Sequence, residues 1–475
     1  MRNSKLVLPK YREVPMIQKS ILDAMQKIVG PQHLLTQKED MLTYSYDAAV
    51  LDPVMPAAAV IPESKEQVGD IIALCAENRI PITVRGSGTN LSGGTIPKSS
   101  GIVMLTGRMN RIIEINEADM YAVVEPGVVT ATLAAEVEKR GLFYPPDPGS
   151  MAVSTIGGNV AENAGGLRGL KYGVTKDYVM GLQFFDSRGN YIKTGSRTVK
   201  CATGYNITGL MVGSEGTLGI LDQVILKLIP APNARQAMVA VYDTIEQASE
   251  TVAGIISARI LPATLEILDN FTIRAVEDFS KAGLPRDAAA LLLIEVDGHP
   301  AVVAEEAEQV KALCLKMGAR TIDQAKDDAQ RDKIWAARRA ALSALAQLKP
   351  TLVLEDATVP RSRIPDMVRS LQDIAKKYRI DIGTFGHAGD GNLHPTILTD
   401  RRNKEEFHRV EQAIEEIFDI ALSMGGTLSG EHGTGIAKAP FLEKEAGYSS
   451  ILFSRRLRAA LDPDNILNPG KITGV

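Results

Sequence analysis

The segment from His387 to His394 contains two histidines at a spacing that could place both imidazoles on one metal ion. Between them lies Asp390-Gly391, a dipeptide preferred in two-residue type I′ hairpin turns because both central positions require φ > 0. Such a turn would place His387 directly opposite His394. Directly paired residues share one face of a hairpin, with Cβ atoms about 5 Å apart. The spacing therefore predicts two imidazoles that together bind zinc, manganese or iron.

A third metal ligand is expected at Glu431, which lies in the glycine-rich run Ser429–Gly435. The alternative is a pair of core or turn histidines without a metal, because a motif match alone is only a hypothesis. The chain has six histidines, and three of them, His387, His394 and His432, lie in these two segments. This concentration favours a site.

Three glycine-rich loops in the first half of the chain are typical of contact with an extended ligand. They are Arg85–Gly94, Pro146–Gly173 and Gly213–Ile220. Glycines with small polar neighbours expose backbone N–H groups, which suits a diphosphate. The first loop lacks the third glycine of the Rossmann fingerprint, and no P-loop motif occurs in the chain. One such loop alone is as readily a plain turn, whereas three among mixed strands indicate a binding site for a flat, rigid molecule.

The elements that must position these segments follow from the apolar pattern. Short strands are expected at 57–61, 81–85, 102–105, 112–115 and 122–125, and Ser64 with Gln67 predicts a capped helix over 66–78. The stretch 145–173 has little periodicity and is expected to be a structureless ligand-binding loop. Pro230–Asn233 indicates a domain boundary, and the alternating strands and helices that follow it predict helices on one face of a sheet. A single basic helix is expected around Trp335 to Leu348.

Composition excludes several classes of function. A length of 475 residues, with 45% hydrophobic and 23% charged residues, indicates a soluble globular protein of two to four domains. The net charge of −4 gives no basic footprint for nucleic acid. No apolar run spans a bilayer, and residues 1–10 lack a signal-peptide core, so a cytoplasmic location is expected. Three scattered cysteines cannot hold an iron–sulfur cluster, so any electron transfer within the chain requires an organic cofactor or a mononuclear metal.

Taken together, the three glycine-rich loops resemble the FAD-binding domain of the vanillyl-alcohol-oxidase (PCMH) type. Gly386–His394, Gly430–Gly433 and Asn468–Lys471 resemble the C-terminal half of its D-2-hydroxy-acid dehydrogenase branch, and Leu352–Pro360 is most similar to the glycolate oxidase flavin subunit. The resemblance implies an α+β fold: a PCMH-type FAD-binding domain, a ferredoxin-like substrate (cap) domain and a C-terminal helical segment. The expected bounds are 1–50 for an N-terminal helical segment, 51–230 for the FAD-binding domain, 231–430 for the cap domain with the metal site, and 431–475 for a segment returning to the flavin.

The resemblance also assigns residues. His387, His394 and Glu431 match its metal ligands, His432 its catalytic base, and Arg338 its clamp on the substrate carboxylate. Its FAD contacts fall on Gly86, Ser87, Gly88, Thr89, Asn90, Gly94, Gly149, Ser150, Gly157, Gly158, Ile220 and Asn468. Each has a simpler interpretation: Arg338 as part of a solvated basic helix face, Glu431 as a helix cap, Asn468 as a turn former.

The implied reaction is oxidation of a short D-2-hydroxy acid, of the glycolate or D-lactate type, to the 2-oxo acid. The metal would act as Lewis acid and template, His432 would take the hydroxyl proton, and hydride would pass to flavin N5. Leu342, Leu354 and Thr396 stand where the hydroxyglutarate branch has further polar residues, which disfavours a long dicarboxylic substrate. His33 is the only histidine before residue 299 and lies outside the flavin loops, so FAD is expected to be non-covalent.

Electrons would leave through a separate acceptor, an iron–sulfur subunit or an electron-transfer protein, in a homo-oligomer or a multi-subunit complex that could contact the inner face of a membrane through its partners. Two other functions remain open. A metal-dependent hydrolase could use the His/His/Glu set to activate water, and it would be colourless when purified. A non-catalytic flavoprotein subunit would contain flavin but show no activity.

Overall fold

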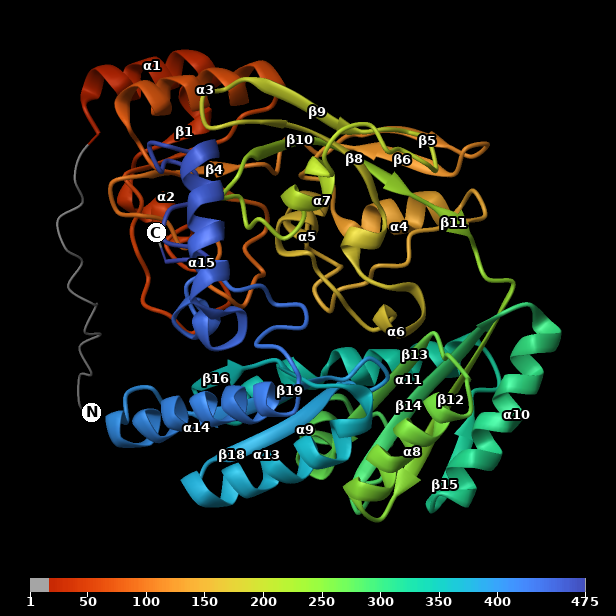
Figure 1. Cartoon of the computed structure of the whole chain (residues 1–475). Helices are drawn as coiled ribbons and strands as arrows, with labels where there is room; N and C mark the ends of the chain where they lie inside the picture. The colour runs from red at the N-terminus through yellow and green to blue at the C-terminus, as the bar shows by residue number, and fades with distance from the viewer. Residues whose placement is uncertain (1–16, 475) are drawn as a thin grey trace.

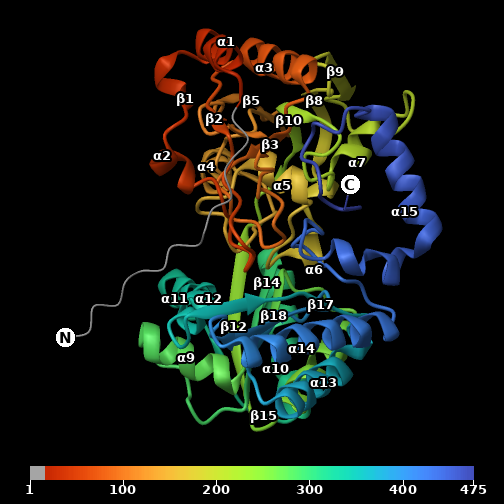
Figure 2. The same cartoon turned by 90° about the vertical axis from the view of Figure 1, so that its left-hand side faces the viewer.

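The computed structural model describes residues 17–474 and forms two lobes, one above the other in Figure 1. The prediction for the first ten residues, and the start of the expected N-terminal segment, lie outside the described part. The N-terminal part of the chain forms the upper lobe, the following part forms the lower lobe, and the C-terminal segment returns to the upper lobe (Figures 1 and 2). Among the described residues, no helix combines the length and apolarity needed to cross a bilayer.

The upper lobe is built on two sheets. One has the order β1-β2-β4-β3, with β2, β4 and β3 parallel, and the other is antiparallel with the order β5-β6-β10-β8-β9. The strands of the first sheet are β1 (Leu34–Leu35), β2 (Ala58–Val60), β3 (Ile82–Arg85) and β4 (Ile102–Leu105). Those of the second are β5 (Ile112–Asn116), β6 (Tyr121–Val124), β8 (Val179–Phe185), β9 (Tyr191–Gly195) and β10 (Ile220–Lys227), and a small ribbon pairs β7 (Leu142–Phe143) with β11 (Ile229–Pro230).

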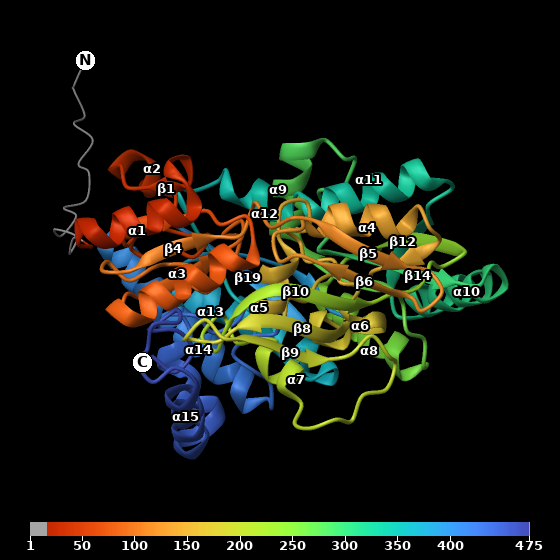
Figure 3. The same ribbon diagram turned by 90° about the horizontal axis from the view of Figure 1, so that it is seen from above.

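The helices of this lobe are α1 (Lys19–Val29), α2 (Lys38–Leu42), α3 (Lys65–Asn78), α4 (Thr130–Glu138), α5 (Ile156–Glu162), α6 (Gly169–Tyr172) and α7 (Ile207–Met211). Seen from above, α1 and α3 lie at one end and α4 at the other (Figure 3). The hydroxyl of Ser64 accepts a hydrogen bond from the N–H of Gln67, as the capping pattern predicts. The prediction of a structureless stretch over 145–173 is wrong in part, because α5 and α6 form there. Thr155 caps α5, and Ile156 and Val160 are buried.

The lower lobe is one antiparallel sheet with the order β15-β12-β14-β13-β18-β19-β16, and β17 pairs with β19. Its strands are β12 (Ala234–Tyr242), β13 (Thr264–Asp269), β14 (Ala290–Gly298), β15 (Ala319–Gln324), β16 (Thr351–Leu354), β17 (Ala357–Thr358), β18 (Asp381–His387) and β19 (Asn392–Thr399). The helices of this lobe are α8 (Ile245–Ser257), α9 (Asn270–Ser280), α10 (Pro300–Lys316), α11 (Asp328–Arg339), α12 (Ala341–Ala346), α13 (Ile364–Tyr378) and α14 (Lys404–Ser423).

Helices cover both faces of this sheet, so the prediction of helices on one face is wrong. Leu292 and Ile294 of β14 pack in one apolar cluster with α8, α10, α13 and α14. Leu291 and Leu293 pack in another with α9, α11 and α12. Successive side chains of a strand point to opposite faces, and β14 is apolar on both. The single helix expected around Trp335 to Leu348 is two helices, α11 and α12.

The C-terminal segment contains α15 (Leu442–Leu461), which is interrupted at Gly447 (φ 75°), and then runs back to the first sheet. The N–H of Ile82 in β3 donates to Ile466, and the N–H of Asn468 donates to Ile82. Residues near 468 are therefore fixed against the strand that leads into the first glycine-rich loop.

Candidate functional site

A cavity of about 690 Å³ contains both groups of residues that the sequence singles out. Every one of the twelve residues expected to contact FAD lines it: Gly86, Ser87, Gly88, Thr89, Asn90, Gly94, Gly149, Ser150, Gly157, Gly158, Ile220 and Asn468. At its other end the lining includes Arg338, His387, His394, Glu431 and His432. The fold thus brings the loops of the upper lobe and the histidines of the lower lobe to one space.

The loop after β3 has the properties of a diphosphate site. The backbone N–H groups of residues 86–90 donate to no acceptor among the described residues, although all five residues line the cavity. Gly88 has φ +70°, a backbone conformation that would be strained for any other residue. Consecutive unpaired N–H groups around a concavity bind anions. The loop therefore fits the diphosphate of FAD.

Asn468 holds three parts of this wall together. Its side-chain N–H groups donate to the carbonyl oxygens of Gly94 (2.8 Å) and Glu215 (2.7 Å), and its oxygen accepts from the hydroxyl of Thr83 (3.1 Å). The side chain is buried. Gly94, Glu215 and Asn468 come from distant parts of the sequence, so the Asn468 side chain fixes the shape of the cavity as well as lining it.

The histidine hairpin differs in register from the prediction. β18 ends at His387, which pairs with Asn392, and His394 pairs with Phe385. The loop therefore has four residues, and Gly391 (φ 94°) has positive φ whereas Asp390 does not, which excludes a type I′ turn. Contacts outside the hairpin impose this loop. The N–H of Gly389 donates to Leu265 (2.9 Å), and the carbonyl of Gly391 accepts from Val359 (3.0 Å).

The two imidazoles nevertheless lie side by side. His387 and His394 are diagonal neighbours on one face of the hairpin, and their ring centroids are 4.9 Å apart. The Nε2 atoms of His387 and His394 lie 3.1 and 3.2 Å from Oε1 of Glu431. Atoms that bind one metal ion at about 2.0–2.2 Å lie about 3 Å from each other. The distances from Glu431 to both imidazoles therefore fit a shared divalent metal ion, and His394 and Glu431 also form, with Asp356 and His432, a group whose candidate ligand atoms all lie within 4.8 Å of one another.

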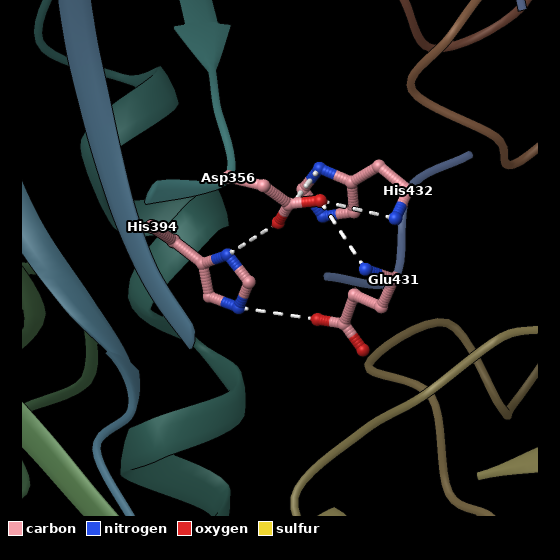
Figure 4. A group of neighbouring side chains, drawn as sticks. All are labelled: Asp356, His394, Glu431 and His432. Atoms are coloured by element: carbon pink, nitrogen blue, oxygen red, sulfur yellow. Dashed lines mark hydrogen bonds and ion pairs between the residues drawn. The ribbon is translucent and has the colours of Figure 1, made fainter. Parts of the chain in front are cut away.

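Asp356, which the sequence did not single out, lies behind this group. Its Oδ1 is 3.3 Å from Nδ1 of His394 and 3.3 Å from Nδ1 of His432, and its Oδ2 accepts from the backbone N–H of His432 (3.1 Å) (Figure 4). Oδ1 and both Nδ1 atoms are buried without a hydrogen-bond partner among the described residues. Asp356 faces both imidazoles. The charged pair Glu355-Asp356 directly after the apolar strand β16 was the signal available in the sequence.

His432 has the properties of a base that is neutral at pH 7. Its ring stacks on that of His394, with centroids 5.3 Å apart, and it lines the cavity. Burial lowers the pKa of His432 to about 4, against the opposing charge of Asp356. An unprotonated imidazole at the cavity wall can accept a proton from a bound hydroxyl group.

A buried carboxylate links the expected carboxylate clamp to the metal cluster. Glu266 of β13 accepts from Nε of Arg338 (2.6 Å) through Oε2, and its Oε1 lies 2.6 Å from Nδ1 of His387. Burial opposes ionisation, but the charges of Arg338 and His387 lower the pKa of Glu266 to about 2. Both Nε and Nη2 of Arg338 face Glu266, so the side that remains for a substrate carboxylate is the Nη1/Nη2 edge. A lone charged residue in the apolar run Thr264–Leu268 was the sequence signal for Glu266.

The lining of the cavity near Arg338 includes apolar side chains beside Arg339 and Ser343. Leu342, Leu354 and Phe385 line it, whereas Thr396, expected beside them, is fully buried and does not. Among the described histidines, only His387, His394 and His432 line the cavity; His33 lies in a turn beside β1.

Comparison with known families assigns both halves of the chain. Residues 56–195 match the family described as FAD binding domain, and residues 231–472 match FAD linked oxidases, C-terminal domain.

Similar proteins of known name extend over nearly the whole chain. The glycolate oxidase subunit GlcD of Bacillus subtilis (strain 168) is 50% identical over 96% of this chain and 97% of its own length. That of Escherichia coli (strain K12) is 37% identical, over 95% and 90%. A D-lactate dehydrogenase of Anaerostipes hadrus is 33% identical, over 94% and 96%.

Solved structures share the fold at low identity. p-Cresol methylhydroxylase with substrate bound superposes with a TM-score of 0.79 at 17% identity, covering 96% of this chain and 98% of that one. Alkyldihydroxyacetonephosphate synthase gives 0.76 at 19% identity, covering 97% and 87%. The expected fold class, a PCMH-type FAD-binding fold joined to further α and β structure, is confirmed.

Proposed function

The chain belongs to the FAD-linked oxidases and is an oxidoreductase, and we propose that it oxidises a short D-2-hydroxy acid, of the glycolate or D-lactate type, to the 2-oxo acid. Relatives named glycolate oxidase subunit and D-lactate dehydrogenase support hydroxy-acid oxidation as the reaction class. One observation carries the finer proposal: the residues that fit FAD, the donors that fit a metal ion and a neutral imidazole all line one cavity.

The chain's own residues divide the work as follows. Bound FAD supplies the acceptor for the two electrons, and a divalent metal ion held by His387, His394 and Glu431 supplies Lewis acidity. The free edge of Arg338 holds the substrate carboxylate, and Glu266 orients that guanidinium. His432 accepts the hydroxyl proton as C2 is oxidised.

The apolar walls favour a small substrate. Leu342 and Leu354 line the cavity close to Arg338 and offer no hydrogen-bond donor to a second carboxylate. A dicarboxylic 2-hydroxy acid whose distal carboxylate lay against these two side chains would lose its hydration there, which costs about 3 kcal/mol or more unless Arg339 or Ser343, which also line the cavity, pairs with it. Glycolate and D-lactate have no such group.

Further parts of the proposal concern organisation. We place the FAD-binding unit at 51–230, the cap unit at 231–430 and the returning segment at 431–475, after an N-terminal segment at 1–50. FAD is non-covalent, since two of the three histidines at the cavity wall are the metal ligands and the third, His432, is the base. Relatives named as subunits support a multi-subunit complex in which a separate iron–sulfur or electron-transfer protein takes the electrons.

The two other candidate functions explain less. A metal-dependent hydrolase leaves the five unpaired N–H groups of residues 86–90 and the FAD-binding family match without a role. A non-catalytic flavoprotein leaves the His/Glu cluster at the flavin cavity without a role.

The test is anaerobic reduction of the flavin by a panel of glycolate, D-lactate, L-lactate and D-2-hydroxyglutarate, followed by absorbance. We expect bleaching with glycolate or D-lactate and none with D-2-hydroxyglutarate. A purified protein without flavin, or one that no 2-hydroxy acid bleaches, would refute the proposal.

The metal is tested separately with His387→Gln and Glu431→Gln, using His408→Gln on the exposed surface of α14 as the control. Both site variants should retain FAD but lose bleaching and bound metal, and the control should retain all three. Bleaching at the wild-type rate in both site variants would remove the metal from the mechanism.

A further inference from the structure

A second cavity, of about 280 Å³, lies where the two lobes meet, beside the first. Four arginines line it: Arg168 from the loop before α6, Arg235 from β12, and Arg331 and Arg339 from α11. The proposed reaction gives none of these four side chains a role. We therefore consider what the cavity could bind.

Three of the arginines have unused donors. The side-chain N–H groups of Arg168, Arg235 and Arg339 make no hydrogen bond to any described residue. Their nearest carboxylates are ion pairs at 3.6, 3.7 and 4.0 Å, beyond hydrogen-bonding distance. Arg168 and Arg235 both lie over the ring of Phe143, 4.9 and 5.5 Å from its centroid, which fixes their guanidinium groups in place. Arg168 and Arg235 therefore have fixed guanidinium groups whose N–H donors lack a hydrogen-bond acceptor among the described residues.

The carboxylates of the cavity are already engaged. Asp147 is buried, accepts from the backbone N–H of Arg168 (3.2 Å) and faces both Arg168 and Arg339. Glu295 is buried and accepts from Nε1 of Trp335 (2.7 Å). With Asp332, three carboxylates stand against four arginines, so the lining carries a net positive charge.

The two cavities share a wall. Arg339 and Leu167 line both of them. Arg339 directly follows Arg338, the expected clamp of the substrate carboxylate. An anion held in the second cavity would therefore lie next to the reaction site.

We propose that the second cavity binds a small carboxylate anion, the substrate or product of the neighbouring site. Planar guanidinium groups bind carboxylates with two parallel hydrogen bonds, and Arg168 and Arg235 supply such donors from opposite lobes. The identity of the anion rests on the proposed function. The binding of an anion does not depend on the proposed function, because it can be measured without turnover.

The chain contains its own reporter of this cavity. Trp335 is the single tryptophan of the chain and lines the second cavity. Its indole N–H donates to Glu295, which lines the same cavity. Its emission therefore responds to charge entering this space. The flavin band in the visible spectrum responds to ligands in the first cavity, so the two sites can be read in one sample.

The experiment titrates the full-length, FAD-loaded protein with pyruvate, acetate and sulfate and follows tryptophan emission and flavin absorbance together. None of these probes can donate hydride to oxidised flavin. We expect emission to saturate with pyruvate and acetate at a dissociation constant different from that of the flavin response. Arg235→Gln should raise the emission constant about tenfold or more, as expected for loss of one charge-assisted bond.

Arg320→Gln is the matched control. Arg320 lies on β15, the strand next to β12, and pairs with Asp243 and Asp287 away from the cavity. Its titration should equal that of the wild type, and thermal melting shows that both variants are folded. Emission that follows the flavin response with one constant, or that is unchanged in Arg235→Gln, would overturn the proposal. A response to sulfate alone would overturn the carboxylate assignment.

The outcomes separate this proposal from the proposed function. Arg235-dependent emission in a protein that no hydroxy acid reduces would keep the second site and refute the enzyme assignment. Reduction by glycolate or D-lactate without any emission response would keep the enzyme assignment and refute the second site.

Discussion

Replacing Glu266 by Gln tests whether one buried carboxylate holds the clamp and the metal cluster together. Glu266 is fully buried and faces Nε and Nη2 of Arg338 and Nδ1 of His387, each at 2.6 Å. Gln has almost the same shape, but only one of its two terminal atoms accepts hydrogen bonds. The variant must therefore leave Arg338 uncompensated or turn its amide N–H group toward His387.

The size of the effect follows from this geometry. Removing one partner of a buried ion pair costs about 3–5 kcal/mol. For a cooperative unit of about 200 residues, unfolding near 60 °C has an entropy of about 0.42 kcal/mol/K, so the melting temperature should fall by about 7–12 °C. If His387 changes tautomer to accept from the amide, its Nε2 becomes protonated and no longer binds a metal ion, and metal affinity should fall about 10–100-fold.

Differential scanning calorimetry measures the first effect, and metal analysis after dialysis measures the second. Glu295→Gln is the matched control. Glu295 is a buried glutamate on the adjacent strand β14, and its single hydrogen-bond donor is the neutral indole of Trp335, which an amide oxygen can equally accept. The control should melt within about 2 °C of the wild type, as expected for a loss below about 1 kcal/mol. Wild-type melting together with wild-type metal content in Glu266→Gln would refute the reasoning.

Three other predictions concern the base, the hairpin loop and the cavity wall. A base must be unprotonated, and burial lowers the pKa of His432 to about 4. The value of kcat/KM for the hydroxy acid should therefore stay level from pH 7 down to about 5 and fall only below that. A fall in kcat/KM centred near pH 6.5 would contradict this prediction. Gly391→Ala should destabilise the protein by at least about 2 kcal/mol in denaturant unfolding, because φ is +94° and a Cβ would lie 2.1 Å from the carbonyl oxygen of Val359. The control is Gly107→Ala, which should have little effect because the space around its Cβ is open. Asn468→Ala removes the donors to two buried carbonyl groups, so we expect a loss of about 2–4 kcal/mol and a lower ratio of FAD to protein after gel filtration; full FAD retention would count against its role in the wall.

The amino-acid sequence by itself determined the parts of the protein that depend on local conformation. Gly88 is required by a backbone with positive φ, so the loop could be recognised without knowing what surrounds it. Strands such as β4 and helices such as α3 form where the apolar periodicity and the cap at Ser64 predict them. The resemblance of these segments to a known family then predicted the fold class, and the comparisons confirm it.

The tertiary structure decided how separate segments meet. Asp390-Gly391 favours a two-residue turn. Backbone hydrogen bonds between Gly389 and Leu265 and between Gly391 and Val359 instead impose a four-residue loop, which shifts the pairing register of His387. Only folding reveals that Glu266 contacts His387, because 121 residues separate them in the sequence. Asp356 and the arginines of the second cavity were missed for the same reason. A periodicity or a turn signal records what the nearest residues require of the backbone, whereas a buried charge or a cavity depends on which distant segments pack together, and no local pattern records that choice.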